Sequence, residues 1–168
     1  MPAPHAPEIQ HVEWTDPRAV AMRALMDAEM HVRYGLDSPA DAELSAKIEH
    51  ALAVDETTVV DTVLLVDEGV AVAHAGLRML GSKPGQEWEV KRVIVDGSQR
   101  GRGLGRAVMT EIIAIARRAG ARRLILQAGD RQPEAVGLYT SLGFTPIPVY
   151  APYAEVMPQS LCFELVLR

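Results

Sequence analysis

The stretch Gln99-Arg100-Gly101-Arg102-Gly103-Leu104-Gly105-Arg106 lies between an apolar, strand-like run at residues 90–95 and a helical pattern that begins at residue 104. A glycine-rich turn at the start of a helix leaves backbone N–H groups unpaired at the positive end of the helix dipole. The arginines add side chains that form charge-assisted hydrogen bonds with anions. The stretch therefore predicts a phosphate-binding turn between a strand and a helix.

Length, composition and charge describe an ordinary globular chain. It has 168 residues, of which 48% are hydrophobic and 23% are charged, so it can build one domain around a sizeable core. The formal net charge of −5 argues against nucleic acid as the main partner, which would favour a broadly basic face. The single cysteine, Cys162, excludes an intrachain disulfide and a multi-cysteine metal site, and it fits a reducing cytoplasm. Because no apolar run reaches about 18 residues, we expect no membrane span and no membrane partner.

The periodicity of apolar residues predicts the element order β-α-α-β-β-β-α-β-α-β-β. Helices are expected at residues 17–34, 39–54, 104–118 and 133–142, and strands at residues 9–14, 57–66, 70–80, 87–95, 122–128, 144–149 and 161–167. Residues 81–85 are expected to form a loop, residues 1–8 a flexible leader, and residues 9–168 a single domain. The pattern predicts a mixed α/β fold, with a central, mostly antiparallel sheet of six to seven strands and about four flanking helices.

Two blocks of sequence resemble the GNAT N-acetyltransferase superfamily. The pattern Arg100-x-x-Gly103-x-Gly105, between a strand and a helix, is similar to the family's acyl-CoA pyrophosphate loop. Residues 131–144 are similar to its C-terminal motif, which has a polar residue, an alanine-rich helix, a tyrosine and then Gly-Phe. The element order matches the GNAT fold from about Ile9 to the end of the chain. A dinucleotide-binding loop is the competing interpretation, but it needs a βαβ unit, and the strands before this turn form a meander.

The resemblance implies that acetyl-CoA is the acyl donor and that no metal is needed. In the family the loop amides hold the pyrophosphate, and the preceding strand pairs with the pantetheine arm as with an added strand. Gln132 stands where the family often has asparagine, and a role at the helix entry is an equal alternative for this longer side chain. The cofactor-binding residues that the resemblance implies are Val93, Ile94, Val95, Arg100, Gly101, Arg102, Gly103, Leu104, Gly105, Arg106 and Gln132.

Tyr139 matches the tyrosine of the family's C-terminal motif. The resemblance implies that its hydroxyl lies near the CoA sulfur and protonates the departing thiolate. A phenol with a pKa of about 10 can donate to a thiolate in this way. Packing in the core, with the hydroxyl satisfied by a hydrogen bond, is the alternative role of such a tyrosine.

Glu89 is the candidate base that accepts the proton of the attacking amine, directly or through water. Related enzymes often carry a glutamate in this strand, and a solvated strand face is the alternative. Strand alternation predicts that four residues share the face of Glu89: Glu87, Lys91, Val93 and Val95. His74, on the preceding strand, is a weaker candidate base. Gln127 stands where some relatives have a carboxylate, and its amide cannot take the proton.

The resemblance implies a cytoplasmic acetyl-CoA-dependent N-acetyltransferase of the direct-transfer type, in which strand amides polarise the thioester carbonyl. The expected acceptor is the primary amine of a small molecule. A pocket for a cationic amine is suggested by Tyr150, Tyr153 and Glu155 together with Glu87 and Glu89. A peptide N-terminus or a lysine is the second choice. A sensor module that binds acyl-CoA with little turnover is the alternative of another class, because Gln127 and Gln132 depart from the family pattern. No nucleic-acid partner is expected, and a homodimer is a possible assembly.

Overall fold

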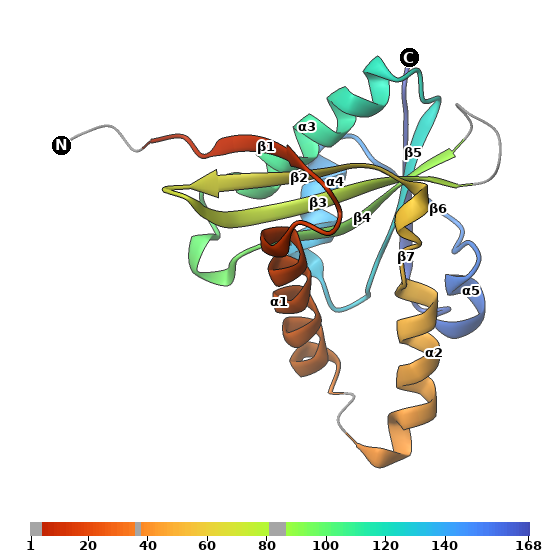
Figure 1. Ribbon diagram of the computed structural model, residues 1–168. Helices are drawn as coiled ribbons and strands as arrows, with labels where there is room; N and C mark the ends of the chain where they lie inside the picture. The colour runs from red at the N-terminus through yellow and green to blue at the C-terminus, as the bar shows by residue number, and fades with distance from the viewer. Residues whose placement is uncertain (1–4, 36–37, 81–86) are drawn as a thin grey trace.

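A seven-stranded sheet forms the centre of the computed structural model, which describes residues 5–35, 38–80 and 87–168 (Figure 1). The strands follow the order β1-β2-β3-β4-β5-β7-β6 across the sheet. Their bounds are β1 (Glu8–Val12), β2 (Val59–Asp67), β3 (Val70–Leu80), β4 (Glu87–Val95), β5 (Arg123–Ala128), β6 (Thr145–Ile147) and β7 (Leu161–Val166). β4 and β5 run parallel, and each other neighbouring pair in this sheet is antiparallel. The predicted mixed α/β fold with a mostly antiparallel sheet is confirmed.

Helices cover both faces of this sheet. The described residues form five α-helices: α1 (Pro17–Tyr34), α2 (Ala42–Leu52), α3 (Leu104–Arg118), α4 (Pro133–Ser141) and α5 (Tyr153–Val156). One face is covered by α3, whose residues Val108, Met109 and Ile112 are fully buried in the main core. On the opposite face α1 packs through Ala19 and Met22, and Figure 1 shows α2 on the same side as α1. Within the described ranges, none of the helices combines the length and the apolar character needed to cross a membrane.

Local capping explains where α1 begins and ends. Asp16 accepts a hydrogen bond from the backbone N–H of Arg18 at 2.9 Å, and Pro17 occupies the first helical position. Gly35 follows the last helical residue in the left-handed conformation, with φ 62°. The helix predicted at residues 17–34 is confirmed at both ends.

Some predicted bounds shift by a few residues. β1 begins at Glu8, inside the segment expected to be a leader, and residues 1–4 of that segment lie outside the described residues. The strand expected at residues 57–66 begins at Val59, because Asp55 caps a single 3-10 turn that precedes it. The loop expected at residues 81–85 also lies outside the described residues. The short helix α5 was not predicted, and it lies in the proline-containing segment before β7.

A β-bulge interrupts β4 at Arg92. Across from β3, His74 pairs with Ile94 whereas Gly76 pairs with Lys91, so β4 carries one extra residue between these two pairs. Arg92 adopts a left-handed backbone conformation with φ 57°, which is uncommon for a residue other than glycine. The strand therefore bends at this residue, and the alternation of its side chains changes there.

The bulge decides which side chains of β4 face the main core. Trp88 and Val90 are buried in that core before the bulge, and Val93 and Val95 pack against it after the bulge. In a regular strand Val90 and Val93, which are three positions apart, would face opposite sides of the sheet. They share a face here because the extra residue of the bulge reverses the alternation. The expectation that Val93 and Val95 lie on the face of Glu89 is therefore wrong.

The sheet opens between β4 and β5. Their pairing covers only residues 87–89 of β4 and residues 123–125 of β5, although β5 continues its pairing with β7 as far as Ala128. The last residues of β4 consequently have no strand beside them on the β5 side among the described residues. This opening provides a row of backbone groups that a bound molecule can pair with.

Candidate active site

A cavity of about 310 Å³ lies at this opening. Its walls come from α1, the end of β4, the turn that leads into α3, and α4 with the residue before it. The predicted residues that line it are Val93, Ile94, Val95, Arg100, Gly101, Gly103, Leu104, Gly105, Arg106, Gln132 and Tyr139. The structure thus brings both sequence blocks to one cavity. Arg102 and Glu89, which were also predicted as site residues, are not part of this lining.

The turn before α3 lines the cavity with residues whose backbone N–H groups have no acceptor within the helix. Gly101 and Gly103 have φ values of 83° and 74°, a conformation that glycine adopts without steric cost. The first helical hydrogen bond runs from the N–H of Ala107 to the carbonyl of Gly103 at 3.0 Å, so the three preceding amides have no acceptor within the helix. These amides belong to Leu104, Gly105 and Arg106, and all three residues line the cavity. The geometry is that of an anion-binding helix N-terminus.

The three arginines of the turn have different surroundings. Arg100 lines the cavity and forms an ion pair with Glu29 of α1 at 2.5 Å. Arg102 instead pairs with Asp67 at the end of β2, at 2.8 Å. Arg106 donates a hydrogen bond to the hydroxyl of Ser141 at the end of α4, at 2.8 Å. Of these three arginines, Arg100 and Arg106 line the cavity, and the charge of Arg100 is already balanced by the carboxylate of Glu29.

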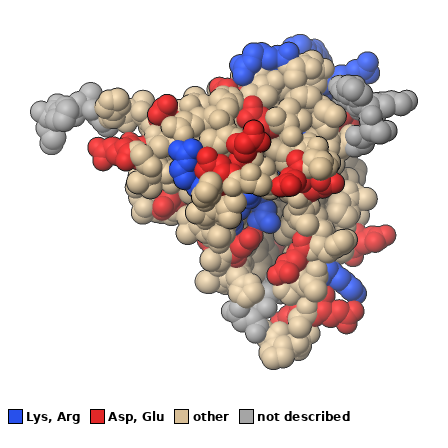
Figure 2. All heavy atoms as spheres, in the orientation of Figure 1, with Lys and Arg blue, Asp and Glu red and all other residues tan. Residues whose placement is uncertain are grey.

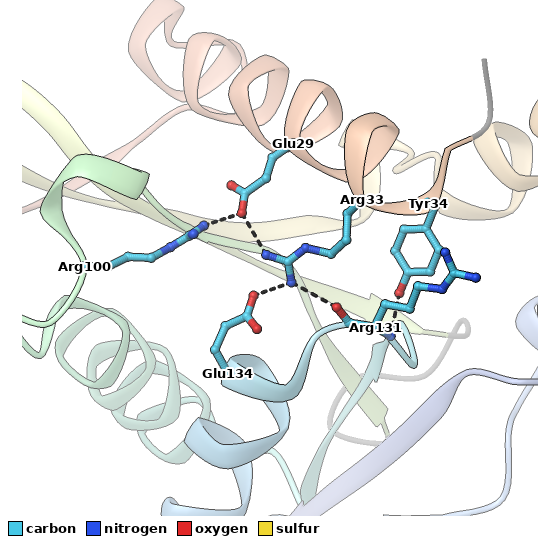
Figure 3. Close-up of polar contacts among 6 residues, drawn as sticks. All are labelled: Glu29, Arg33, Tyr34, Arg100, Arg131 and Glu134. Carbon is cyan, nitrogen blue, oxygen red and sulfur yellow. Dashed lines mark hydrogen bonds and ion pairs between the residues drawn. The ribbon is translucent and has the colours of Figure 1, made fainter.

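A network of ion pairs joins α1 to the turn and to α4 (Figure 3). Glu29 contacts both Arg100 and, at 3.0 Å, Arg33 one turn further along α1. Arg33 in turn pairs with Glu134 of α4 and donates to the backbone carbonyl of Arg131 at 3.1 Å. Because Glu29 and Glu134 line opposite walls of the cavity, Arg33 bridges the two walls.

Tyr139 lies on α4 with its ring in the main core. The ring centroid is 5.9 Å from that of Phe144 and 6.2 Å from that of Phe163, and the residue is 6% exposed. Burial raises the pKa of the Tyr139 hydroxyl well above its usual value, so the phenol keeps its proton. The residue also lines the cavity. Core packing and a place at the cavity are therefore both properties of this side chain.

Glu89 lies at the centre of a buried polar cluster on the other face of β4. Its Oε1 pairs with Arg78 at 2.6 Å, and its Oε2 accepts hydrogen bonds from the hydroxyls of Tyr150 at 2.7 Å and Tyr153 at 3.1 Å. Lys91 donates to the Tyr153 hydroxyl at 2.7 Å, and burial lowers the pKa of Lys91 to about 8. Glu89 is fully buried, so the alternative of a solvated strand face is wrong.

A second hollow of about 450 Å³ lies beside β5, near this cluster. Tyr150 and Ile125 are part of its lining, and its rim carries Glu87, whose carboxylate pairs with Arg123. Because the Tyr150 hydroxyl donates to Glu89, it connects this hollow with the buried carboxylate. The acidic residues expected to attract a cationic amine therefore already have cationic partners at two positions, Glu87 and Glu89.

Charged side chains are distributed unevenly over the surface. Figure 2 shows acidic atoms scattered over the face that carries α1 and α2, whereas Lys and Arg atoms gather over the end of α3. The last turn of α3 carries Arg117 and Arg118, which complement the negative end of the helix dipole. A helix of 15 residues spans about 20 Å, so these cations lie far from the turn at its other end.

His74 and Gln127 both have partners inside the protein. The Nδ1 atom of His74 lies 2.7 Å from the carbonyl oxygen of Arg92, and its Nε2 atom lies 3.1 Å from Nη1 of Arg23. Burial lowers the pKa of His74 to about 4, and the nearby charges of Arg23 and Arg92 act in the same direction. Gln127 donates to the hydroxyl of Ser160 at 2.9 Å. Neither residue lines the cavity.

Two residues that the structure brings to these sites, Glu29 and Arg78, were not predicted from the sequence. Glu29 lines the first cavity, and only its spacing of four residues from Arg33 on a predicted helix could have indicated a structured ion pair. Arg78 pairs with Glu89 across the β3–β4 hairpin, where register could have indicated the pair, since the two residues face each other.

Solved structures share this architecture over nearly the whole chain. A proposed acyl-CoA N-acyltransferase from Klebsiella pneumoniae superimposes with a TM-score of 0.76 and 27% identity, covering 96% of this chain and 98% of that one. A GNAT family acetyltransferase from Elizabethkingia anophelis, solved with acetyl-CoA bound, superimposes with a TM-score of 0.65 and 14% identity, covering 95% and 97% of the two chains. The second likeness concerns the fold alone.

Curated relatives match shorter segments. The chain is 34% identical over 88 residues to N-alpha-acetyltransferase RimI of Mycobacterium tuberculosis, which is 52% of this chain and 54% of that protein. It is 33% identical over 86 residues to mycothiol acetyltransferase of Beutenbergia cavernae, which is 51% of this chain and 28% of that protein. The chain thus spans about half or less of the length of these relatives. The model of the acetyltransferase (GNAT) family matches residues 19–144, which include the turn, the cavity and Tyr139, and the chain belongs to this family.

Proposed function

We propose that this protein is an acetyl-CoA-dependent N-acetyltransferase that acts on the primary amine of a small molecule. The proposal rests on one observation: the turn before α3, the end of β4 and Tyr139 all line the same cavity. Membership of the GNAT family supports an acyl-CoA as the occupant. The acetyl-CoA in the Elizabethkingia anophelis protein of the same fold points the same way.

The donor would bind along the cavity in an extended form. The amides of Leu104, Gly105 and Arg106 would hold the pyrophosphate at the helix N-terminus. The backbone of residues 93–95 would pair with the amide groups of the pantetheine arm, as an added strand does. Gln132, on the opposite wall, is in a position to contact the same arm.

Transfer would then proceed by direct attack. The amine nitrogen forms a bond to the thioester carbon while backbone N–H groups of β4 stabilise the charge on the carbonyl oxygen. The carbon–sulfur bond breaks, and Tyr139 donates its proton to the thiolate sulfur. The amine proton passes to Glu89 through the Tyr150 hydroxyl or a water molecule, because Glu89 itself is buried. Exchange with solvent returns both groups to their starting states.

One assay tests the donor and the acceptor together. Free-thiol release from acetyl-CoA is measured with amino acids, polyamines, aminoglycosides and short peptides as acceptors. We expect release with at least one small amine. Reaction with peptides alone would support the second candidate, a peptide acetyltransferase, which is favoured by the similarity to a protein named N-alpha-acetyltransferase. Binding of acetyl-CoA without thiol release from any acceptor would support the sensor, and failure to bind acetyl-CoA would overturn the proposal.

A further inference from the structure

The bulge of β4 requires support from outside the strand. Arg92 is an L-residue in the left-handed region, with φ 57°, a conformation that persists only where surrounding contacts hold it. The extra residue also removes the Arg92 backbone from the regular ladder between β3 and β4. We therefore expect the Arg92 carbonyl to accept a hydrogen bond from a side chain that is itself held in place.

His74 supplies that partner from the adjacent strand. It is fully buried, and its Nδ1 atom lies 2.7 Å from the Arg92 carbonyl oxygen. A carbonyl oxygen can only accept a hydrogen bond, so Nδ1 must carry the hydrogen. The bond joins the bulged residue directly to the middle of β3.

Arg23 fixes the other nitrogen of the same ring. Its Nη1 lies 3.1 Å from Nε2 of His74, and a guanidinium can only donate, so Nε2 must present its lone pair. Burial lowers the pKa of His74 to about 4, which agrees with a neutral ring. The two contacts together specify the Nδ1–H tautomer.

Trp14 holds Arg23 in place. Nη2 of Arg23 donates to the Trp14 carbonyl at 2.6 Å, and the guanidinium carbon lies 3.7 Å from the centroid of the indole ring. The space for the indole exists because residue 76 is glycine: a Cβ there would lie 2.7 Å from a ring atom of Trp14. On the other side of the bulge, the Arg92 side chain pairs with Asp27 of α1. The bulge is thus held from β3 through its carbonyl and from α1 through its side chain.

We propose that His74 is a positioning residue of the acyltransfer reaction: as the Nδ1–H tautomer, it holds the β4 bulge at the angle that presents residues 93–95 to the acyl donor. The inference rests on the proposed function, because those residues line the cavity assigned to the donor. Removing the contact would let the backbone after the bulge rotate. The thioester carbonyl would then lose its alignment with the β4 amides, while the pyrophosphate turn, which His74 does not contact, would still bind the donor.

Two substitutions at position 74 and one elsewhere test this role. His74→Leu removes both hydrogen bonds, and we expect kcat to fall about tenfold to 100-fold. His74→Gln carries an N–H and a carbonyl on one side chain and should restore much of kcat. In both variants the Kd for acetyl-CoA should stay within about threefold of the parent. Thr62→Val is the matched control, since Thr62 is also fully buried in the sheet and its hydroxyl has no hydrogen-bond partner among the described residues. A kcat for His74→Leu equal to that of Thr62→Val would overturn the positioning role.

Nitrogen NMR of the unmodified protein tests the tautomer without relying on a variant that folds. With ¹⁵N-labelled histidine at neutral pH, the ring of residue 74 should show a protonated Nδ1 and an unprotonated Nε2. A ring protonated at Nε2, or one in fast exchange between tautomers, would overturn the inference. This result is independent of turnover. Absence of thiol release by the parent enzyme would count against the proposed function and its link to His74, and the tautomer would still decide whether the ring holds the bulge.

Discussion

The two sides of β4 differ in how far their charged and polar groups are buried and paired within the protein. On the donor side, the cavity is lined by apolar side chains, by three amides without an acceptor in the helix, and by charged side chains that include Arg100 and its partner Glu29. The Arg100 side chain is 42% exposed. On the other side, Glu89 is fully buried and has its carboxylate oxygens occupied by Arg78 and two tyrosine hydroxyls. The donor side therefore offers helix N–H groups and a partly exposed arginine to the cavity, whereas the Glu89 cluster is electrostatically complete within the protein.

This difference follows from one extra residue. Before the bulge, alternate residues of β4 carry charge away from the main core, and after the bulge the strand contributes apolar side chains and backbone to the cavity. The same strand therefore carries a buried carboxylate on one side, and on the other side its last residues line the cavity. The following predictions test how separate the two sides are.

The largest effect is expected when the buried carboxylate is neutralised. Glu89→Gln leaves Arg78 and Lys91 without their anionic partner, and breaking a buried ion pair typically costs about 3–5 kcal/mol. Glu87→Gln is the matched control two residues away, where the ion pair with Arg123 is partly exposed and should be worth about 1 kcal/mol or less. Urea unfolding measures both. Equal losses of unfolding free energy in the two variants would show that the ion pair of Glu89 contributes no more to stability than the partly exposed pair of Glu87.

On the donor side, Tyr139→Phe should act on the chemical step alone. Loss of a general acid reduces kcat by about 100-fold or more, while the ring keeps its packing against Phe144 and Phe163. The Kd for acetyl-CoA should change little, as measured by titration calorimetry. Tyr34→Phe serves as the control, because its hydroxyl accepts a hydrogen bond from the Arg131 amide and has no proposed chemical role. Unchanged turnover in Tyr139→Phe would remove this residue as the acid.

Lys91 should make the protein less stable at neutral pH than it would be with an apolar residue. Its pKa is lowered by burial from 10.5 to about 8, so folding disfavours the ammonium form. The cost is present in full below pH 8 and disappears as the pH rises from about 8 to about 10.5. We expect Lys91→Met to stabilise the fold by about 1–2 kcal/mol at pH 7, with a smaller gain at pH 10.

Lys47→Met, on the exposed side of α2, is the control for that measurement. Its effect on the free energy of unfolding should stay within about 0.5 kcal/mol at either pH. A destabilised Lys91→Met would mean that the ammonium group is needed to balance Glu89, and that the cluster depends on both of its cations.

The smallest effect is expected from Glu29→Gln. Its carboxylate occupies Arg100 and competes with any phosphate for that side chain, so its removal should tighten acetyl-CoA binding about two- to fivefold. S-acetylpantetheine, which lacks the pyrophosphate, should bind both proteins equally. Glu43→Gln, whose ion pair with Lys47 lies on α2, should leave both affinities unchanged. Weaker acetyl-CoA binding in Glu29→Gln would show that the network in Figure 3 supports the donor rather than competing with it.

Much of the donor side could be predicted because its signals are local. A glycine run between a strand and a helix requires particular backbone angles, and the structure has Gly101 and Gly103 in the left-handed region at the start of α3. The bounds of β4 followed from a run of alternating and apolar residues ended by Asp96. These features depend on neighbours within a few positions along the chain.

The rest depends on contacts between distant segments. Glu89 meets Tyr150 across 61 positions of sequence, and nothing near either residue specifies the pairing. The bulge at Arg92 has no turn residue to mark it, and its support comes from His74 on another strand. Strand alternation therefore placed Val93 and Val95 on the wrong face.

The opening between β4 and β5 leaves the end of β4 without a neighbouring strand on the β5 side among the described residues. A row of unpaired backbone groups inside a fold resembles the edge of an open sheet, which readily pairs with a strand of another chain. Occupation of the cavity would cover this inner edge, so amides of residues 93–95 should exchange with deuterium slowly when the donor is bound and quickly when it is not. Protein stored without a CoA ligand should aggregate sooner on warming than protein stored with one.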